Sequence, residues 1–175
     1  MAQIVGRSNE IMDVLSDGSG VVQATTLSQL AKASEEGRAF SWVSAATDID
    51  TTDTRLFVKN TGTAPLHVSY LRFNGSNVIC QWTVLKGSAA TTPTGTLVTG
   101  ANLNFGSAKV AAAISYDDET AVADGTVIDR VWTPITNTLT VDMSEVILTT
   151  GTYIQINQIT ESTSGSVILR GWFEA

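Results

Sequence analysis

Residues Leu66–Lys86, with the sequence LHVSYLRFNGSNVICQWTVLK, contain the strongest strand signals in this chain. Asn74-Gly75 lies between two apolar runs, and Asn-Gly is the most favourable dipeptide for a tight β-hairpin turn. The sequence therefore predicts two strands that fold back on each other at Asn74-Gly75.

Both faces of this predicted hairpin carry large apolar side chains. Successive residues of a strand point to opposite faces of a sheet. With a loop of even length, one face contains Leu71, Phe73, Val78, Cys80, Trp82 and Val84, and the other contains Leu66, Val68, Tyr70, Ile79 and Leu85. We therefore expect both faces to be covered, as in an inner hairpin of a sandwich.

Short strand patterns continue on both sides of this stretch. They occur at residues 39–43, 54–60, 96–99, 103–105, 110–116, 127–133, 138–142, 146–148, 153–159 and 166–173. We expect 146–148 and 153–159 to pair about Thr149–Thr152. Short strands with frequent turn signals and no βαβ alternation predict an all-β fold, an antiparallel β-sandwich of the jelly-roll type.

Residues 1–38 have a different pattern from the predicted sandwich domain at 39–175. Their apolar pairs are separated by Gly, Ser, Asn and Asp, which indicates an extended arm that grips a neighbouring subunit. The candidate partner-binding residues are Ile4, Val5, Ile11, Met12, Val14 and Leu15. The alternative is that they pack only on their own domain. A short helix is expected at Leu27–Glu36, capped by Thr25 or Thr26 and ended by Gly37.

Composition excludes several classes of function. The net charge is −7, the ten basic residues form no cluster, and nucleic-acid binding is therefore not expected. The single cysteine, Cys80, rules out an intramolecular disulfide framework. No secretion signal or membrane-length apolar run is seen, so we expect synthesis and folding in the cytoplasm.

The sequence contains no catalytic motif that we can identify. His67 is the only histidine, and neither a GxSxG elbow nor a glycine-rich phosphate loop is present. We interpret His67 and Cys80 as structural residues and expect neither enzymatic activity nor a cofactor. Two acidic groups are interpreted as solvated loops with a weak calcium signal: Asp48, Asp50 and Asp53, and Asp117, Asp118, Glu119 and Asp124. Asp48-x-Asp50 matches only the start of a calcium loop.

One part of the chain resembles small phage virion proteins. In these, an aromatic-Ser-aromatic strand precedes an Asp-rich turn, a "DT-x-L-x-V-x-N" strand and a "PLHV"-like strand. Here Phe40-Ser41-Trp42 is followed by Asp53, Thr54, Leu56, Val58 and Asn60, by Leu66-His67-Val68, and by a Gly171–Glu174 ending. Residues 39–175 are thus similar to tailed-phage head decoration (cement) proteins with a jelly-roll body.

The resemblance implies a structural virion protein without transferable catalytic residues. Such proteins are typically trimers at local threefold positions of the capsid, and their N-terminal segments often contact neighbouring subunits or the shell. The expected partners are the major capsid protein and further copies of the chain, as a homotrimer on the capsid exterior. Nucleic acid and membrane are not expected partners.

Two other functions stay open at this point. A receptor- or carbohydrate-binding head of a tail fibre or spike would have loop aromatics clustered at one end of the sandwich. A glycan-processing enzyme would need two loop carboxylates facing each other across a cleft.

Overall fold

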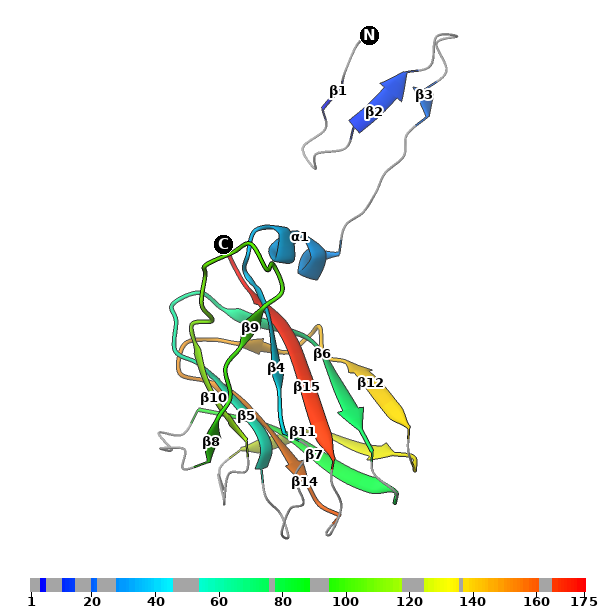
Figure 1. Cartoon of the computed structure of the whole chain (residues 1–175), viewed down its shortest axis with the longest axis vertical. Coiled ribbons are helices and arrows are strands. Elements are labelled where there is room, and N and C mark those ends of the chain that lie inside the picture. The colour runs from blue at the N-terminus through cyan, green and yellow to red at the C-terminus, as the bar shows by residue number, and fades with distance from the viewer. Residues whose placement is uncertain are drawn as a thin grey trace.

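The computed structural model describes residues 4–5, 11–14, 20–21, 28–45, 54–75, 78–88, 95–117, 125–135, 137–160 and 165–175. For the first three of these ranges only the backbone is described. Most of the described chain forms two antiparallel sheets that pack face to face (Figure 1).

Each sheet has six strands. The first sheet contains, in spatial order, β11 (Thr126–Thr133), β7 (Cys80–Gly87), β14 (Tyr153–Gln158), β5 (Thr54–Asn60), β10 (Ala113–Asp117) and β8 (Thr96–Leu97). The second contains β12 (Thr138–Asp142), β6 (Leu66–Asn74), β15 (Ser166–Phe173), β4 (Ala39–Val43) and β9 (Ala101–Asn102), and β13 (Ile147–Leu148) also pairs with β6.

Eight of these strands have the pairing pattern of a jelly roll. In chain order they are β4, β5, β6, β7, β11, β12, β14 and β15. The first pairs with the eighth, the second with the seventh, the third with the sixth, and the fourth with the fifth. The predicted antiparallel sandwich of jelly-roll type is therefore confirmed.

The predicted hairpin at Asn74-Gly75 is wrong. β6 lies in the second sheet and β7 in the first, so the chain crosses from one sheet to the other between them. β6 instead pairs with β12 and β15, and β7 pairs with β11 and β14. Among the described glycines, positive φ occurs at Gly37 and Gly151, not at Gly75. The two apolar strands thus face each other across the core.

β6 has apolar residues at even-numbered positions in its first half and at odd-numbered positions in its second half, and a β-bulge explains this change. Its register with β15 shifts by one residue, so that Gly171 pairs with Val68 while Arg170 pairs with Tyr70, and Ser69 is the extra residue. The bulge brings the two phases to one side: Leu66, Val68, Leu71 and Phe73 are all buried. The prediction that Leu66 and Val68 lie opposite Leu71 and Phe73 is therefore wrong.

Gly171 is required opposite this bulge. A Cβ atom at this position would lie 2.6 Å from the carbonyl oxygen of His67. Only glycine allows β15 to approach the bulged part of β6 this closely.

The core lies between the sheets and includes the two buried tryptophans. Trp82 packs against Phe73 with ring centroids 5.3 Å apart, and its indole N–H donates to Thr133 Oγ1 at 3.1 Å. Trp42 packs against Phe40 at 6.1 Å. Cys80 is fully buried, which fits its interpretation as a small structural residue.

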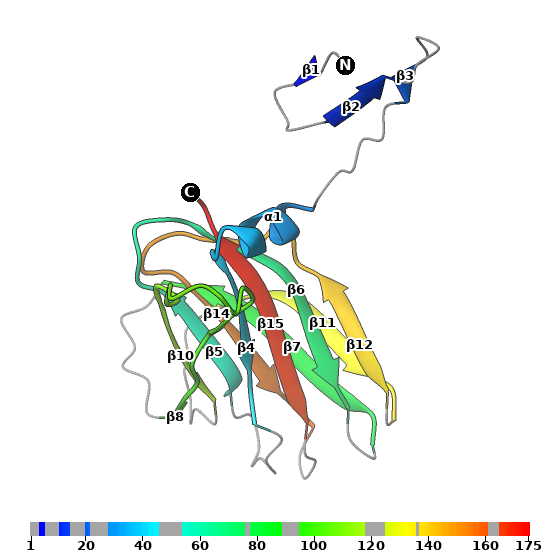
Figure 2. The same ribbon diagram turned by 45° about the horizontal axis from the view of Figure 1, so that its top comes forward.

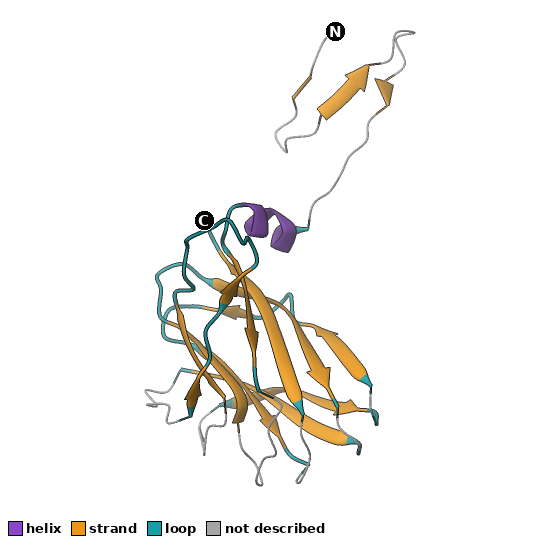
Figure 3. Cartoon of the chain, in the orientation of Figure 1, coloured by secondary structure: helices purple, strands orange, loops and turns teal. Residues whose placement is uncertain are grey.

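The predicted helix is confirmed, with a different cap. α1 (Gln29–Glu35) packs against β4 and β15 and stands at one end of the sandwich (Figure 3). Its N-cap is Ser28, whose Oγ accepts from the amide of Ala31 at 3.2 Å, rather than Thr25 or Thr26. Gly37, with φ +69°, ends it in a Schellman motif. No helix in the described ranges is long and apolar enough to cross a membrane.

Two other local predictions are corrected. β13 pairs with β6, and β14 with β5 and β7, so the expected pairing of residues 146–148 with 153–159 does not form. Residues 103–105 form a turn after β9 rather than a strand. The insertion that contains β8, β9 and β10 extends both sheets on one side of the sandwich.

Candidate partner-binding surface

The sandwich has one long open edge. β11 and β12 end the two sheets on the same side, whereas β8 and β9, of two residues each, end them on the other (Figure 2). β11 has eight residues, so the described strands leave a long row of its backbone groups without a neighbouring strand. Such an edge is a template for pairing with another chain.

Apolar side chains are concentrated at this open edge. Of the eleven large hydrophobic side chains that are exposed in the described residues, five lie on β11 or next to its C-terminal end: Val127, Ile128 and Trp132 on the strand, Ile135 two residues after it, and Ile79 directly before Cys80, which pairs with Thr133. Trp132 is 55% exposed although the neighbouring Val131 and Thr133 are buried in the core. We call these five residues the β11 apolar surface. Exposed apolar side chains gathered at an open edge make this surface a candidate contact site.

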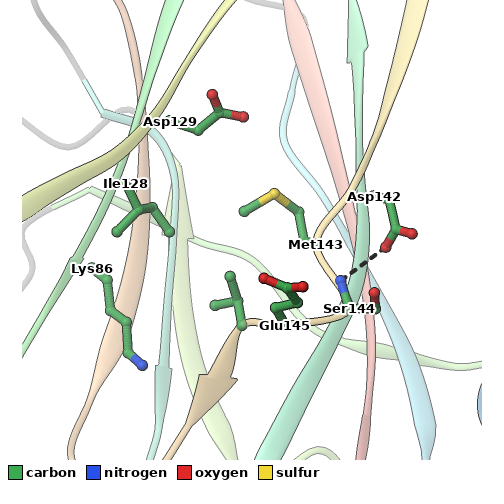
Figure 4. Close-up of a pocket in the computed structure, with 8 residues that line it drawn as sticks. Lys86, Ile128, Asp129, Asp142, Met143, Ser144 and Glu145 are labelled. Carbon is green, nitrogen blue, oxygen red and sulfur yellow. Dashed lines mark hydrogen bonds between the residues drawn. The ribbon is translucent and has the colours of Figure 1, made fainter.

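A groove of about 560 Å³ separates β11 from the turn that follows β12. We call it the edge groove, and its lining comprises Lys86, Ile128, Asp129, Asp142, Met143, Ser144, Glu145 and Val146. Figure 4 shows Lys86, Ile128 and Asp129 on one side of it and the residues of the turn on the other. Its lining thus combines apolar side chains with three carboxylates and one ammonium group.

The charged groups of the edge groove are held by local hydrogen bonds. The Lys86 ammonium donates to the carbonyl oxygen of Ile147 at 2.8 Å and so links the two sheets. Asp142 Oδ1 accepts from the Ser144 amide at 2.9 Å. Hydrogen bonds from Ser144 lower the pKa of the Asp142 carboxyl below its ordinary value of 3.8. Asp142 is therefore a carboxylate at neutral pH.

A second, smaller cleft of about 340 Å³ lies between the start of α1 and the outer face of β6 and β15. His67 and Trp172 stack in it with ring centroids 4.1 Å apart and nearly parallel planes. His67 Nε2 also lies 3.8 Å from a carboxylate oxygen of Glu174. Ser144 lines both this cleft and the edge groove, so the two depressions meet at this residue.

The predicted partner-binding residues of the arm fall in a separate small sheet. Ile4 and Val5 form β1 (Ile4–Val5), and Ile11, Met12 and Val14 belong to β2 (Ile11–Val14). β1 and β3 (Gly20–Val21) pair with β2 on its two sides, and none of the three joins either sheet of the sandwich. Leu15 lies outside the described residues.

Metal ions are held by sets of ligand side chains, among them those of His, Cys, Asp and Glu. The described side chains contain no group of three or more of these residues that suits a metal ion. The interpretation of Asp117 as part of a solvated loop is wrong: it ends β10 and is buried, because its carboxylate accepts a hydrogen bond from the amide of Ala45 at 2.8 Å. The other acidic residues of the weak calcium prediction, Asp48, Asp50, Asp53, Asp118, Glu119 and Asp124, lie outside the described residues.

The residues that carry the family resemblance have structural contacts. The buried Asn60 amide donates to the carbonyl oxygens of Ala64 and Leu148, at 2.8 and 2.9 Å. Its oxygen accepts from the amide of Gly62. Asn60 thus closes the loop after β5 and ties it to β13.

Comparisons with models of protein families, with curated proteins and with solved structures found no match.

Sequence reasoning missed the open edge and its groove. The lining residues come from the end of β7, the bulged start of β11 and the turn after β12, which are far apart in the chain. The only local signal was Val127-Ile128 beside Asp129, where a bulge between Val127 and Asp129 interrupts the register with β7. That signal indicates an irregular strand, not a binding surface.

Proposed function

We propose that this protein is a structural component of a tailed-phage virion, which decorates the capsid and stabilises it by bridging neighbouring coat subunits. The observation that supports this most strongly is the β11 apolar surface, because it gives a folded, jelly-roll body a ready contact area along one edge. The resemblance of residues 39–175 to head decoration proteins supplies the class of partner.

The contact would work through burial of apolar area and not through chemistry. A stable protein–protein interface buries roughly 1,200–2,000 Å² in total, and its energy is concentrated in a few central residues, among which Trp is enriched. Trp132 is the largest exposed side chain at this edge, and it is paired in register with Gln81 of β7. The exposed Ile79 lies two residues before Gln81. These residues are the centre of the proposed coat contact.

The receptor- or glycan-binding alternative has no specific observation in its favour. It requires aromatic side chains clustered at one end of the sandwich. Among the described residues, Phe105 and Trp132 are the strongly exposed aromatics, and they belong to opposite edges, near β9 and on β11.

Binding to purified heads that lack the protein tests the proposal. The chain is mixed with such heads, and the bound fraction is measured by co-sedimentation and by cryo-electron microscopy of the particles. We expect saturable binding at symmetric positions on the shell and greater resistance of decorated heads to heating. Absence of the chain from both reconstituted and native heads would overturn the proposal.

A pair of variants locates the contact. Trp132→Asp should abolish binding, because it places a charge at the centre of the proposed interface. Leu97→Asp is the matched control, since Leu97 is 65% exposed but lies on β8 at the opposite edge. A chain lacking residues 1–24 tests the arm separately: full occupancy by this truncated chain would show that the arm is not needed for decoration.

A further inference from the structure

Phe105 is fully exposed in the turn that follows β9. Val110, which lies in the same loop before β10, is 79% exposed. Scattered exposed apolar residues are common on protein surfaces, so exposure alone does not indicate a contact site. What distinguishes Phe105 is the way in which the surrounding turn is held.

The backbone on both sides of Phe105 is fixed by hydrogen bonds. Asn104 Nδ2 donates to the carbonyl oxygen of Glu35, the last residue of α1, at 3.0 Å. Asn104 also accepts from the amide of Gly106 at its side-chain oxygen and from the amide of Ser107 at its carbonyl oxygen. The loop after β9 therefore lies against the end of α1 (Figure 1). Because the backbone of this turn is already ordered, Phe105 loses little conformational freedom when a partner binds it.

The cleft at the start of α1 has the size and lining to receive one aromatic ring, and we call it the helix cleft. Its volume of about 340 Å³ is near the lower limit of roughly 300 Å³ for ligand pockets. The apolar part of its lining comes from Leu30, Val68 and the stacked rings of His67 and Trp172. Aromatic rings pack favourably against one another in offset or edge-to-face arrangements. The helix cleft therefore suits a single aromatic side chain better than a large ligand.

Phe105 does not occupy the helix cleft of its own chain. Gln29 and Leu30 line the cleft at the start of α1, whereas the turn is bonded to Glu35 at the end of the helix. A helix rises 1.5 Å per residue, so these two ends lie about 9 Å apart. Phe105 is also fully exposed, so its ring fills no pocket of its own chain. Since the turn and the cleft both lie at the α1 end of the sandwich, a second copy can supply the ring.

The charges around the two features are complementary. The end of α1 and the turn contain three basic residues and two acidic ones: Lys32, Arg38 and Lys109, and Glu35 and Glu36. Arg38 pairs with the Glu36 carboxylate. The Lys109 ammonium donates to the Glu36 carbonyl oxygen at 2.9 Å, and its other N–H groups can bind a carboxylate.

The helix cleft has the opposite charge. Its described lining contains no lysine or arginine. Glu174 stands beside it with a side chain that is 57% exposed, and its carboxylate lies 3.8 Å from His67 Nε2. A cation next to Phe105 of one copy can therefore meet an anion next to the cleft of another.

We propose that Phe105 of one molecule inserts into the helix cleft of a second copy of this chain. Its ring packs against Trp172 and Leu30 of the second molecule, and Lys109 of the first molecule lies near Glu174 of the second. The contact joins two different surfaces, so the assembly closes when every copy both gives and receives a ring. It uses neither the arm nor the β11 apolar surface and does not rest on capsid binding, so either proposal can fail while the other stands.

Disulfide trapping with a full chain that carries two new cysteines tests the contact. Gly106→Cys places a thiol beside Phe105 and keeps the ring, and a Cβ atom there meets only Asn104 Oδ1, at 3.4 Å. Gln29→Cys places a thiol at the helix cleft. The two are not expected to bridge within one chain, because a disulfide needs Cα atoms within about 7 Å and the ends of α1 are farther apart. Under mild oxidation we expect covalent dimers and larger species on non-reducing gels.

The two single-cysteine chains are the matched controls, and the native Cys80 is fully buried. Each control should remain a monomer on the gel, because the proposed contact brings position 29 to position 106 and neither position to itself. Two results would overturn the proposal. One is no covalent dimer from the double variant above the controls. The other is an equally strong dimer from either control, which would mean that like surfaces meet.

Sedimentation velocity across a concentration series measures how much the ring contributes. Phe105→Asp should raise the dissociation constant of self-association roughly tenfold or more, because it replaces the buried ring with a charge. Leu97→Asp, at an exposed position of β8, is the matched control and should leave the constant unchanged. An unchanged constant for Phe105→Asp, or a native chain that stays monomeric up to about 1 mM, would refute the contact.

A charge exchange tests the orientation of the two molecules. Lys109→Glu should weaken self-association severalfold at low salt, and adding Glu174→Lys to the same chain should restore most of the affinity, because the pair is re-formed with reversed signs. A double variant that binds no more tightly than Lys109→Glu alone would contradict the proposed placement of Lys109 near Glu174.

Discussion

The hydrogen bond between Trp82 and Thr133 gives the sharpest test of how the core is held. The indole N–H of Trp82 on β7 donates to Thr133 Oγ1 on β11, both side chains are fully buried, and the distance is 3.1 Å. Thr133→Val keeps the size of the side chain and removes the acceptor. The buried indole N–H is then left without this partner, and an unsatisfied buried polar group costs about 1–3 kcal/mol.

This cost is large for a domain of this size. Single domains are stable by only about 5–15 kcal/mol, so the substitution should shift the midpoint of urea unfolding clearly. Trp82→Phe removes the donor instead, and in that background Thr133→Val should cost less, because no indole N–H remains to be stranded and only the 3.4 Å hydrogen bond from Thr133 Oγ1 to the carbonyl oxygen of Cys80 is lost. The double-mutant cycle should therefore give a coupling free energy of about 1–3 kcal/mol.

The assay is equilibrium urea unfolding followed by far-UV circular dichroism, because loss of Trp82 would alter a fluorescence signal. Thr140→Val, at an exposed position of β12, is the control and should change the free energy of unfolding by less than about 0.5 kcal/mol. The reasoning is refuted if Thr133→Val destabilises the chain equally with and without the indole at position 82.

Three further predictions follow from local contacts. Gly171→Ala should cost about 1–3 kcal/mol in thermal or urea unfolding, because its Cβ would lie 2.6 Å from a carbonyl oxygen of β6. Ser28→Ala should destabilise the chain by about 1 kcal/mol, since the amide of Ala31 loses its cap, and Ser28→Asp should restore it. Asp142→Asn should lower stability at neutral pH, and its difference from the unchanged chain should vanish in acid. The folded pKa of Asp142 is lowered by Ser144, so its contribution is present above the ordinary value of 3.8 and is lost as pH falls through the folded pKa.

The jelly-roll topology bears on where partners can bind. The insertion with β8, β9 and β10 occupies one side of the sandwich, so the long free strand β11 is confined to the other. Among the described strands, this asymmetry leaves a single extended edge open. The expected effects of Trp132→Asp and Leu97→Asp differ for this reason.

Local alternation was enough to predict most strands. The bounds of β4, β5, β12 and β15 match the predicted ranges, because each contains a run of alternating or continuous apolar residues between turn-forming residues. The helix was also predictable, since its apolar spacing and its terminal Gly37 are local signals. The N-cap residue of the helix could not be predicted, because several Ser and Thr residues precede the helix and each is a suitable cap.

Strand partners were beyond the reach of the sequence. Asn74-Gly75 favours a hairpin locally, but β6 and β7 each pair on both sides with strands from distant parts of the chain and bury their apolar faces against each other. Partner choice is decided by burial summed over both sheets, which outweighs the preference of one dipeptide for a turn.

The sequence by itself determined that this chain is an all-β sandwich with an apolar N-terminal segment, because composition and the two-residue period are properties of neighbouring residues. Only the tertiary structure decided that the bulge at Ser69 unites the two apolar phases of β6. It also decided that Ile128, Asp142 and Glu145 meet around one groove. The bulge and the groove both depend on contacts between residues far apart in the chain, and the local pattern of apolar residues does not specify such contacts.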